Sequence, residues 1–300
     1  MKRSKSSWTQ RAQAFWDARQ RLAAPGALTG YLQDESPLCI GQRRFDGEWV
    51  QVKTWIDQRG LARGRCLDLG CGTGIWLKAL AQEFKQVEGW DFAPAMIKAS
   101  RQTFKDAGLR APTLKIGQIK RRQERHVFDL IFVGGVLMYT PDAELGPMLK
   151  ALARLLKPGG LLILRESTCR GETWLREGAP LRRGFLAKAG STKEVDYVAV
   201  YRSVKTLTRW VADAGFKVAA IEANRNYKLS DMTEDWLRRF DLLLLGKVRK
   251  NAQVTESLAR WIYRFRFLLL YPEYILRHYL GLWPWKLDNH WFLLNLVDVE

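Results

Sequence analysis

Cysteine and histidine are scarce in this sequence. Its 300 residues include three histidines and four cysteines, namely Cys39, Cys66, Cys71 and Cys169. These cysteines form no C-x-x-C pair and have no histidine nearby, so we expect neither a structural zinc site nor another bound metal. The same scarcity favours reduced thiols and a cytoplasmic protein.

Long hydrophobic runs are also missing. A membrane-spanning helix needs about 20 consecutive apolar residues, and the richest run here, Phe267–Pro272, lies between Arg266 and Glu273. The first residues, Met1–Trp8, are basic and no apolar stretch follows them, which predicts that no secretory signal is present. A composition of 47% hydrophobic and 27% charged residues excludes a disordered or fibrous chain.

Acidic residues are few for the number of basic ones. Asp and Glu total 31 against 49 Lys and Arg, a formal net charge of +18. Such an excess favours an anionic partner, which would be a nucleic acid, an acidic membrane surface or a phosphorylated substrate. The alternative is a basic surface without a specific partner.

Residues 64–227 alternate short apolar runs with helical patterns, which is typical of βαβ units around a parallel sheet. We expect strands at Arg65–Leu69, Gln86–Asp91, Thr113–Ile116, Phe128–Gly134, Leu161–Glu166 and Lys217–Asn224. Helices are expected at about 75–84, 94–107, 143–156 and 204–213. Residues 168–202 do not fit the alternation and are interpreted as a long insertion after the fifth strand.

The chain after residue 227 has a different character. Residues 228–289 are helical in pattern, with arginines between many aromatic side chains. The following run, 290–297, resembles a buried strand, and we expect it to pair antiparallel with the strand at 217–224. The predicted organisation is an N-terminal helical cap (1–63), one α/β domain (64–227 and 290–300) and a basic aromatic helical insertion (228–289).

The strongest local motif follows the first expected strand. After Asp68 and Leu69 come three alternating glycines, Gly70, Gly72 and Gly74, and a helix begins at Ile75. Glycines allow a sharp turn and a close approach of the backbone to a ligand, and the helix N-terminus offers free N–H groups. A dehydrogenase fingerprint would need glycine at position 75, where this chain has Ile75.

A second feature lies at the end of the second expected strand. Asp91 stands there, and a carboxylate at this place can accept hydrogen bonds from a ribose. Together with Phe128–Val133 and the turn at Leu155–Leu161, these motifs resemble the class I S-adenosylmethionine-dependent methyltransferases. The resemblance implies a Rossmann-like, doubly wound, mostly parallel seven-stranded α/β sheet with an antiparallel last strand, here with helical insertions.

The resemblance also implies S-adenosylmethionine as the cofactor and assigns residues to it. The expected cofactor-binding residues are Asp68, Gly70, Gly72, Gly74, Asp91, Phe92, Gln118 and Gly134. The three glycines would lie under the methionine part of the cofactor, Asp91 would bind the ribose hydroxyls, and Phe92 would lie beside the adenine. Gln118 stands where the family often has an acidic residue for the adenine amino group.

Candidates for the acceptor side follow the carboxyl ends of later strands, where open α/β sheets bind ligands. They are Tyr139 and Glu166, which can orient a hydroxyl or an amine. Tyr201 and Arg202 stand just before the helix expected at 204–213, where the resemblance implies contact with substrate, and Arg202 can bind a phosphate or carboxylate. For each residue the alternative is a structural role, such as packing or an ordinary ion pair.

The expected reaction is methyl transfer to a small-molecule or lipid-like acceptor by in-line displacement. The insertion at 228–289 is interpreted as an amphipathic surface that contacts an acidic membrane, which implies a cytoplasmic protein, peripheral on the inner face of a membrane. Packing on the core or a dimer interface is an equal alternative. RNA or protein recognition ranks third and uses Lys2, Arg3 and the cluster at 120–122. A non-catalytic cofactor-binding subunit is the alternative to an enzyme, and the oligomeric state is left open.

Overall fold

A computed structural model describes residues 7–22, 36–119, 124–177, 197–278, 280 and 287–297. Lys2, Arg3 and the basic cluster at 120–122 lie outside the described residues. Within the described part of the chain, no helix combines the length and the apolar character needed to span a membrane.

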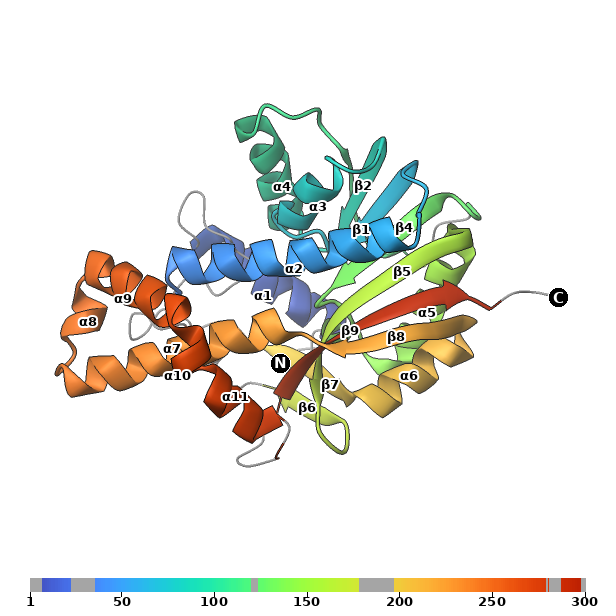
Figure 1. Cartoon of the computed structure of the whole chain (residues 1–300). Coiled ribbons are helices and arrows are strands. Elements are labelled where there is room, and N and C mark those ends of the chain that lie inside the picture. Colours follow the sequence, from blue (N-terminus) through green and yellow to red (C-terminus); the bar gives the residue numbers. More distant parts are fainter. Residues whose placement is uncertain are drawn as a thin grey trace, which may run out of the picture.

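One mixed sheet of nine strands forms the centre of the fold (Figure 1). The strands are β1 (Arg65–Leu69), β2 (Gln86–Asp91), β3 (Thr113–Ile116), β4 (Phe128–Gly134), β5 (Leu156–Cys169), β6 (Trp174–Glu177), β7 (Val198–Ser203), β8 (Phe216–Ala223) and β9 (Leu287–Leu296). Strands β1 to β5 pair in parallel in the order β3-β2-β1-β4-β5. This arrangement confirms the predicted Rossmann-like class.

Strand β9 lies between β5 and β8 and is antiparallel to both. Leu164 of β5 is opposite Phe292 of β9, which is in turn opposite Ile221 of β8. The expected antiparallel pairing of the last strand is therefore confirmed, and β9 begins three residues earlier than expected because Leu287 pairs with Cys169.

Helices cover both faces of the sheet. They are α1 (Trp8–Leu22), α2 (Leu38–Gln58), α3 (Ile75–Leu80), α4 (Pro94–Asp106), α5 (Asp142–Leu155), α6 (Val204–Asp213), α7 (Arg225–Leu243), α8 (Lys247–Lys250), α9 (Ala252–Arg264), α10 (Arg266–Leu269) and α11 (Tyr271–His278), with a short 3-10 helix, η2, at Leu137–Tyr139. Because side chains alternate along a strand, Leu162 and Leu164 pack against α5 and α6, whereas Leu161 and Ile163 pack against α2 and α3.

Some expected elements have different limits. Helix α3 ends at Leu80 rather than 84, and the chain continues in tight turns. Strand β5 begins at Leu156, because Leu156 pairs with Phe128 before an irregularity in the ladder. The long insertion expected at 168–202 includes β6 and most of β7, which pair antiparallel and belong to the sheet.

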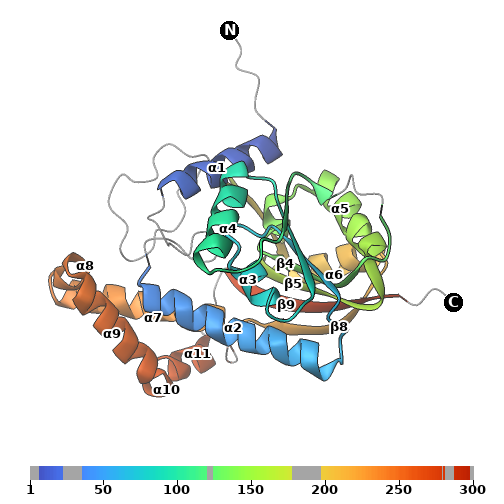
Figure 2. The same cartoon turned by 90° about the horizontal axis from the view of Figure 1, so that it is seen from above.

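Helices α7 to α11 form a helical lobe between β8 and β9 (Figures 1 and 2). Apolar side chains of α2, α7, α8, α9 and α11 make a separate core in it, including Ile40, Leu237, Val248, Ile262 and Tyr274. The lobe and the sheet therefore have distinct cores, which α2 joins through its two ends.

Trp291 of β9 is the central aromatic side chain of the core under α2. It is 0% exposed and packs against Trp55, Trp76 and Phe132, with ring centroids 5.4–6.5 Å apart. We expect Trp291→Ala to lower the free energy of unfolding by about 3–5 kcal/mol, measured by urea denaturation, because the side chain leaves a cavity.

The control for this variant is Val50→Ala. Val50 lies on α2 and is 64% exposed, so the same measurement should change by less than about 0.5 kcal/mol. A loss below about 1 kcal/mol for Trp291→Ala would contradict the packing described here.

Candidate functional site

The turn after β1 lies at the carboxyl edge of the sheet and has glycine at three of its positions. Gly70, Gly72 and Gly74 all have positive φ, at 76°, 51° and 83°. A Cβ on Gly70 would lie 2.2 Å from Cγ2 of Val136, and one on Gly74 would lie 2.5 Å from Oγ of Ser100. Glycine is required at both positions, by conformation and by space.

Asp91 holds this turn from the end of β2. Its carboxylate accepts hydrogen bonds from the N–H groups of Gly72, at 3.0 Å, and Ala93, at 2.8 Å. Burial raises the pKa of Asp91 to about 6, against the lowering effect of these two hydrogen bonds. The carboxylate therefore joins the glycine turn to the second strand.

Asp68 lies beneath the same turn. It is buried, and burial together with the charge of Asp91 raises its pKa to about 8, although the Leu77 N–H donates to it. Its Oδ2 atom has no hydrogen-bond partner among the described residues. A buried polar atom of this kind is normally satisfied by a ligand or an ordered water.

Two adjoining hollows open beside the glycine turn, and Gly70, Asp91, Phe92, Val136 and Tyr139 belong to both. We call them the first hollow and the second hollow. The space within them amounts to about 640 and 630 Å³, a volume that includes open solvent at their mouths.

The first hollow has mainly apolar walls. Its lining includes Trp90, Ile119 and Met148, and the amide of Gln118 lies at its edge. The Nε2 atom of Gln118 donates to Glu144 at 3.0 Å, so its amide is fixed in place. A flat apolar group with a few polar atoms suits this space.

The second hollow combines aromatic side chains with one guanidinium. Trp16, Trp76 and Tyr139 line it together with Gly134 and Arg165. The Tyr139 ring meets the Trp16 ring edge to face, with centroids 5.4 Å apart. Burial raises the pKa of Tyr139 well above its usual value, so the phenol stays neutral near neutral pH.

Arg165 lies on the strand face opposite to its neighbour Glu166. Its Nε atom is 2.7 Å from Oε2 of Glu48, a fully buried residue of α2 that Arg44 also contacts at 3.1 Å. The sequence motifs point to Glu166 and not to Arg165. A signal for Arg165 is nevertheless present, because side chains alternate along a strand and Arg165 therefore shares the α2 face of β5 with Leu161 and Ile163.

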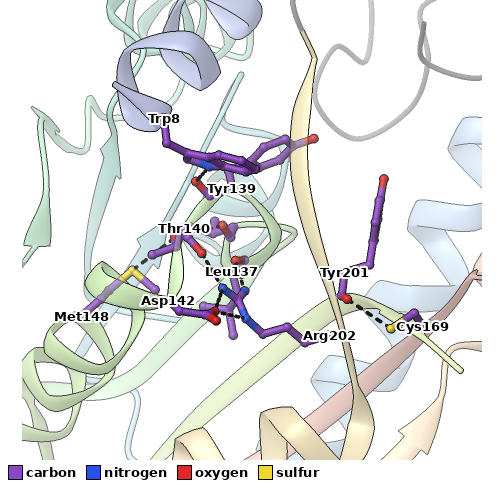
Figure 3. Close-up of polar contacts among 10 residues, drawn as sticks. Trp8, Leu137, Tyr139, Thr140, Asp142, Met148, Cys169, Tyr201 and Arg202 are labelled. Atoms are coloured by element: carbon purple, nitrogen blue, oxygen red, sulfur yellow. Dashed lines mark hydrogen bonds and ion pairs between the residues drawn. The ribbon is translucent and has the colours of Figure 1, made fainter. Parts of the chain in front are cut away.

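Helix α1 covers part of both hollows. Thr9 and Ala12 line the first one and Trp16 lines the second. Trp8 Nε1 donates to the Tyr139 carbonyl at 2.9 Å (Figure 3), and Asp17 accepts from the Ala95 N–H at 2.9 Å. Sequence reasoning treated this helix only as a cap and missed its part in the site.

Glu166 positions the backbone above the site. One of its oxygens accepts from the N–H groups of Val136 and Leu137, at 2.9 and 3.0 Å. Burial raises the pKa of Glu166 to about 7, against the effect of these two donors. Glu166 is not among the described residues that line either hollow, so it acts through the backbone of the β4–η2 turn.

Arg202 and Tyr201 differ from expectation. The Arg202 guanidinium, 2% exposed, donates to the carbonyls of Leu137 and Thr140 and to Asp142 (Figure 3). These contacts favour the structural alternative for Arg202, an ion pair within the protein, over contact with a substrate anion. Tyr201 is buried too, its hydroxyl 2.7 Å from that of Tyr197, and it lines neither hollow.

Comparison with known proteins gives a consistent result. Residues 66–160 match the model of a methyltransferase domain. The ubiquinone biosynthesis O-methyltransferase of Pseudomonas paraeruginosa is 34% identical over 185 residues, 59% of this chain and 78% of that protein. The demethylmenaquinone methyltransferase of Bacillus cytotoxicus is 33% identical over 169 residues, 51% of this chain and 70% of that protein.

Other relatives match a smaller part. The ubiquinone biosynthesis O-methyltransferase of Pseudomonas aeruginosa is 34% identical over 112 residues, 37% of this chain, and the chain spans about half (47%) of that relative's length. Among solved structures, geranyl diphosphate C-methyltransferase from Streptomyces coelicolor superposes with a TM-score of 0.56 and 14% identity over 98% of this chain and 99% of that one. The [4+2]-cyclase SpnF gives 0.57 and 14%, over 98% of each chain. Both share the fold.

The fold, the glycine turn and the relatives define one class of protein. The chain belongs to the class I S-adenosylmethionine-dependent methyltransferases. The resemblance found in the sequence is thereby confirmed. The residues present also fit S-adenosylmethionine, because a Cβ would fill the turn at Gly70, and because buried carboxylates lie beneath that turn and at the end of β2.

The raised pKa of Asp91 predicts pH-dependent cofactor binding. Ribose hydroxyls donate to the ionised carboxylate, so below a pH of about 6 binding must displace a proton. We expect the Kd for S-adenosylmethionine, measured by calorimetry, to rise about tenfold for each pH unit below that value. From there to neutral pH it should change little.

The matched control is Asp91→Asn, which keeps the size of the side chain and removes its titration. This variant should bind the cofactor more weakly at neutral pH and lose the dependence below pH 6. An unchanged affinity of the wild-type protein across the acidic range would contradict the role of Asp91.

Proposed function

We propose that this chain transfers the methyl group of S-adenosylmethionine to a small-molecule or lipid-like acceptor. The observation that carries the proposal is the second hollow, which adjoins the glycine turn and is lined by aromatic side chains and the Arg165 guanidinium. When bound, the cofactor supplies a methyl group on a positively charged sulfur, and the bond to the acceptor forms as the carbon–sulfur bond breaks. The electron pair of the broken bond stays on sulfur.

The chain contributes mainly by positioning, which can supply a large part of such a rate enhancement. The glycine turn and Asp91 would hold the cofactor's amino acid and ribose parts at the carboxyl edge of the sheet. Gln118 and Phe92, which line the first hollow, would lie on the adenine side. Trp16 and Tyr139 line the second hollow and would limit the access of water to the acceptor.

The lining of the second hollow also limits the acceptor. Its described titratable residues are Cys71, Asp91, Tyr139 and Arg165. Tyr139 stays neutral, burial raises the pKa of the Cys71 thiol, and Asp91 is engaged with the glycine turn. We therefore favour an acceptor that needs no strong base, such as an acidic phenol, an enol or another group that arrives as an anion.

Arg165 supports an oxygen-bearing acceptor. A guanidinium offers several N–H donors in one plane, which suits a phenolate, a carbonyl or a carboxylate. The curated relatives are named for ubiquinone and menaquinone biosynthesis, which supports a small aromatic acceptor of quinone type. Flat rings suit a hollow bounded by Trp16, Trp76 and Tyr139.

Our proposal includes association with an acidic membrane surface, where a lipid-like acceptor would be found. The net charge of +18 and the helical lobe beside the site support this part. The chain would then be cytoplasmic and peripheral on the inner face of a membrane.

The acceptor class is testable with methyl-labelled S-adenosylmethionine and a fractionated bacterial cell extract. We expect label in the organic or small-molecule fraction, at least about tenfold above the Asp91→Asn variant. Label confined to RNA or protein would contradict the proposed acceptor class, and no label in any fraction would contradict methyl transfer.

Arg165→Lys tests whether the acceptor meets this guanidinium. Lysine keeps the charge near Glu48 but loses the planar set of donors, so we expect KM for the acceptor to rise about tenfold. The Kd for the cofactor should stay within about twofold. A weaker cofactor affinity with an unchanged KM would assign Arg165 to the cofactor's carboxylate instead.

A further inference from the structure

Four consecutive leucines span the end of α7 and the turn that leads into α8. Leu242, Leu243, Leu244 and Leu245 are 50–84% exposed, and we call them the leucine turn. The backbone reverses at Leu245 and Gly246, which have φ values of 51° and 78°. Gly246 N–H closes the turn on the Asp241 carbonyl at 2.7 Å.

Leucine is an unfavourable choice for such a turn if folding alone is considered. Exposed turns normally use Gly, Asn, Asp, Ser or Pro, and a branched apolar residue with positive φ is uncommon. The leucine side chains gain little burial in the described structure in return. Contiguous exposed apolar side chains of this kind mark a surface that contacts something apolar.

Phe240 links the leucine turn to aromatic side chains at the end of α9, since its carbonyl accepts the Leu244 N–H at 2.9 Å. Phe240 of α7 lies 6.5 Å from Trp261, which lies 5.2 Å from Phe265, all measured between ring centroids. Trp261, Phe265 and Leu268 are 46%, 39% and 75% exposed. Beneath them Leu237, Val248 and Ile262 are buried in the lobe core, which holds this surface in one shape.

Cations border the leucine turn directly. Lys247, Arg249 and Lys250 follow it, and no acidic residue occurs between 242 and 255. Arg249 lies 3.5 Å from Asp241 at the base of the turn, and Lys247 and Lys250 are exposed. This order matches the layers of an anionic bilayer. The leucines at the tip correspond to the acyl chains, and the cations and Trp261 behind them correspond to the charged headgroups and the headgroup boundary.

The leucine turn lies at the outer end of the lobe. Both views place α8 far from the sheet, on a part of the molecule that projects from the body (Figures 1 and 2). A projecting tip can enter a soft, extended surface, whereas the apolar anchor of a protein partner usually fills a pocket. The lobe departs from the carboxyl end of β8, which is the edge of the sheet that carries the two hollows.

We infer that the leucine turn docks this chain on an anionic lipid bilayer, with Lys247 and Lys250 at the headgroup phosphates. Trp261 and Phe265 would lie at the boundary between headgroups and acyl chains. This inference rests on the proposed function, since a lipid-like acceptor gives the contact its use, but docking and methyl transfer can be measured separately.

The test is flotation of the full chain with vesicles. One set contains equal parts of phosphatidylcholine and phosphatidylglycerol, and the other contains phosphatidylcholine alone. The variant Leu242→Ser/Leu243→Ser/Leu245→Ser removes three exposed leucines, and Val50→Ser, also exposed but on α2, is the matched control. We expect the wild-type protein and the control to float with anionic vesicles and the leucine variant to bind at least about tenfold more weakly.

A second variant, Lys247→Gln/Lys250→Gln, tests the charge. It should weaken binding to anionic vesicles about tenfold and leave the weak binding to phosphatidylcholine unchanged. Calorimetric Kd values for the cofactor should be the same in all these proteins, which shows that the variants fold.

Several outcomes would overturn the inference. One is the absence of wild-type flotation with anionic vesicles, and another is full flotation of the leucine variant. A third outcome is that the wild-type protein is a dimer in sedimentation velocity, the leucine variant is a monomer, and neither binds vesicles. The leucine turn would then be an interface between copies of this chain. Methyl transfer without flotation overturns the docking alone, whereas flotation without methyl transfer supports the docking and contradicts the proposed function.

Discussion

The antiparallel pairing of β9 with both β5 and β8 determines where the helical lobe lies. Strand β8 ends at the carboxyl edge of the sheet, and β9 must begin at that same edge to run back between its neighbours. Everything between Ala223 and Leu287 therefore leaves and returns beside the two hollows. The lobe's position next to the site follows from strand pairing and requires no separate docking interaction.

Buried polar groups secure this junction. Asn224 Nδ2 donates to Glu48 at 2.7 Å and to Asn289 at 2.8 Å, and Lys228 donates to the Leu287 carbonyl at 2.7 Å. Glu48 also contacts Arg165, so one fully buried carboxylate joins α2, β5 and the start of the lobe. Removing one partner of such a buried charged group usually costs about 3–5 kcal/mol. Glu48 therefore connects Arg165, in the wall of the second hollow, to Asn224, at the base of the lobe.

Local sequence signals were sufficient for strands β1 to β5, for the antiparallel last strand and for the conformation of the glycine turn. The glycine spacing, Asp91 and the apolar runs act within a few residues of the chain, and their structures follow from backbone conformation and alternation. Tyr201 pairs with Tyr197, only four residues earlier in the chain, but the burial of both rings is evident only from the structure. The role of Arg202 depends on a distant partner, Asp142, which no local pattern identifies. The same reason applies to β6 and β7, where pairing across the insertion overrides scattered glycines. The leucine turn is visible in the sequence as four adjacent leucines, but their exposure is evident only from the structure.

Helix α1 bears on how the two hollows open. Besides side-chain packing, three hydrogen bonds hold it: the Trp8 indole donates to the Tyr139 carbonyl, the Thr9 hydroxyl donates to Glu144, and the Ala95 N–H donates to the Asp17 carboxylate. Thr9, Ala12 and Trp16 also line the two hollows. These contacts lie at the periphery of the fold, whereas the glycine turn and Asp91 belong to the central sheet. A local displacement of α1 would therefore widen the mouth of the hollows and leave the glycine turn in place.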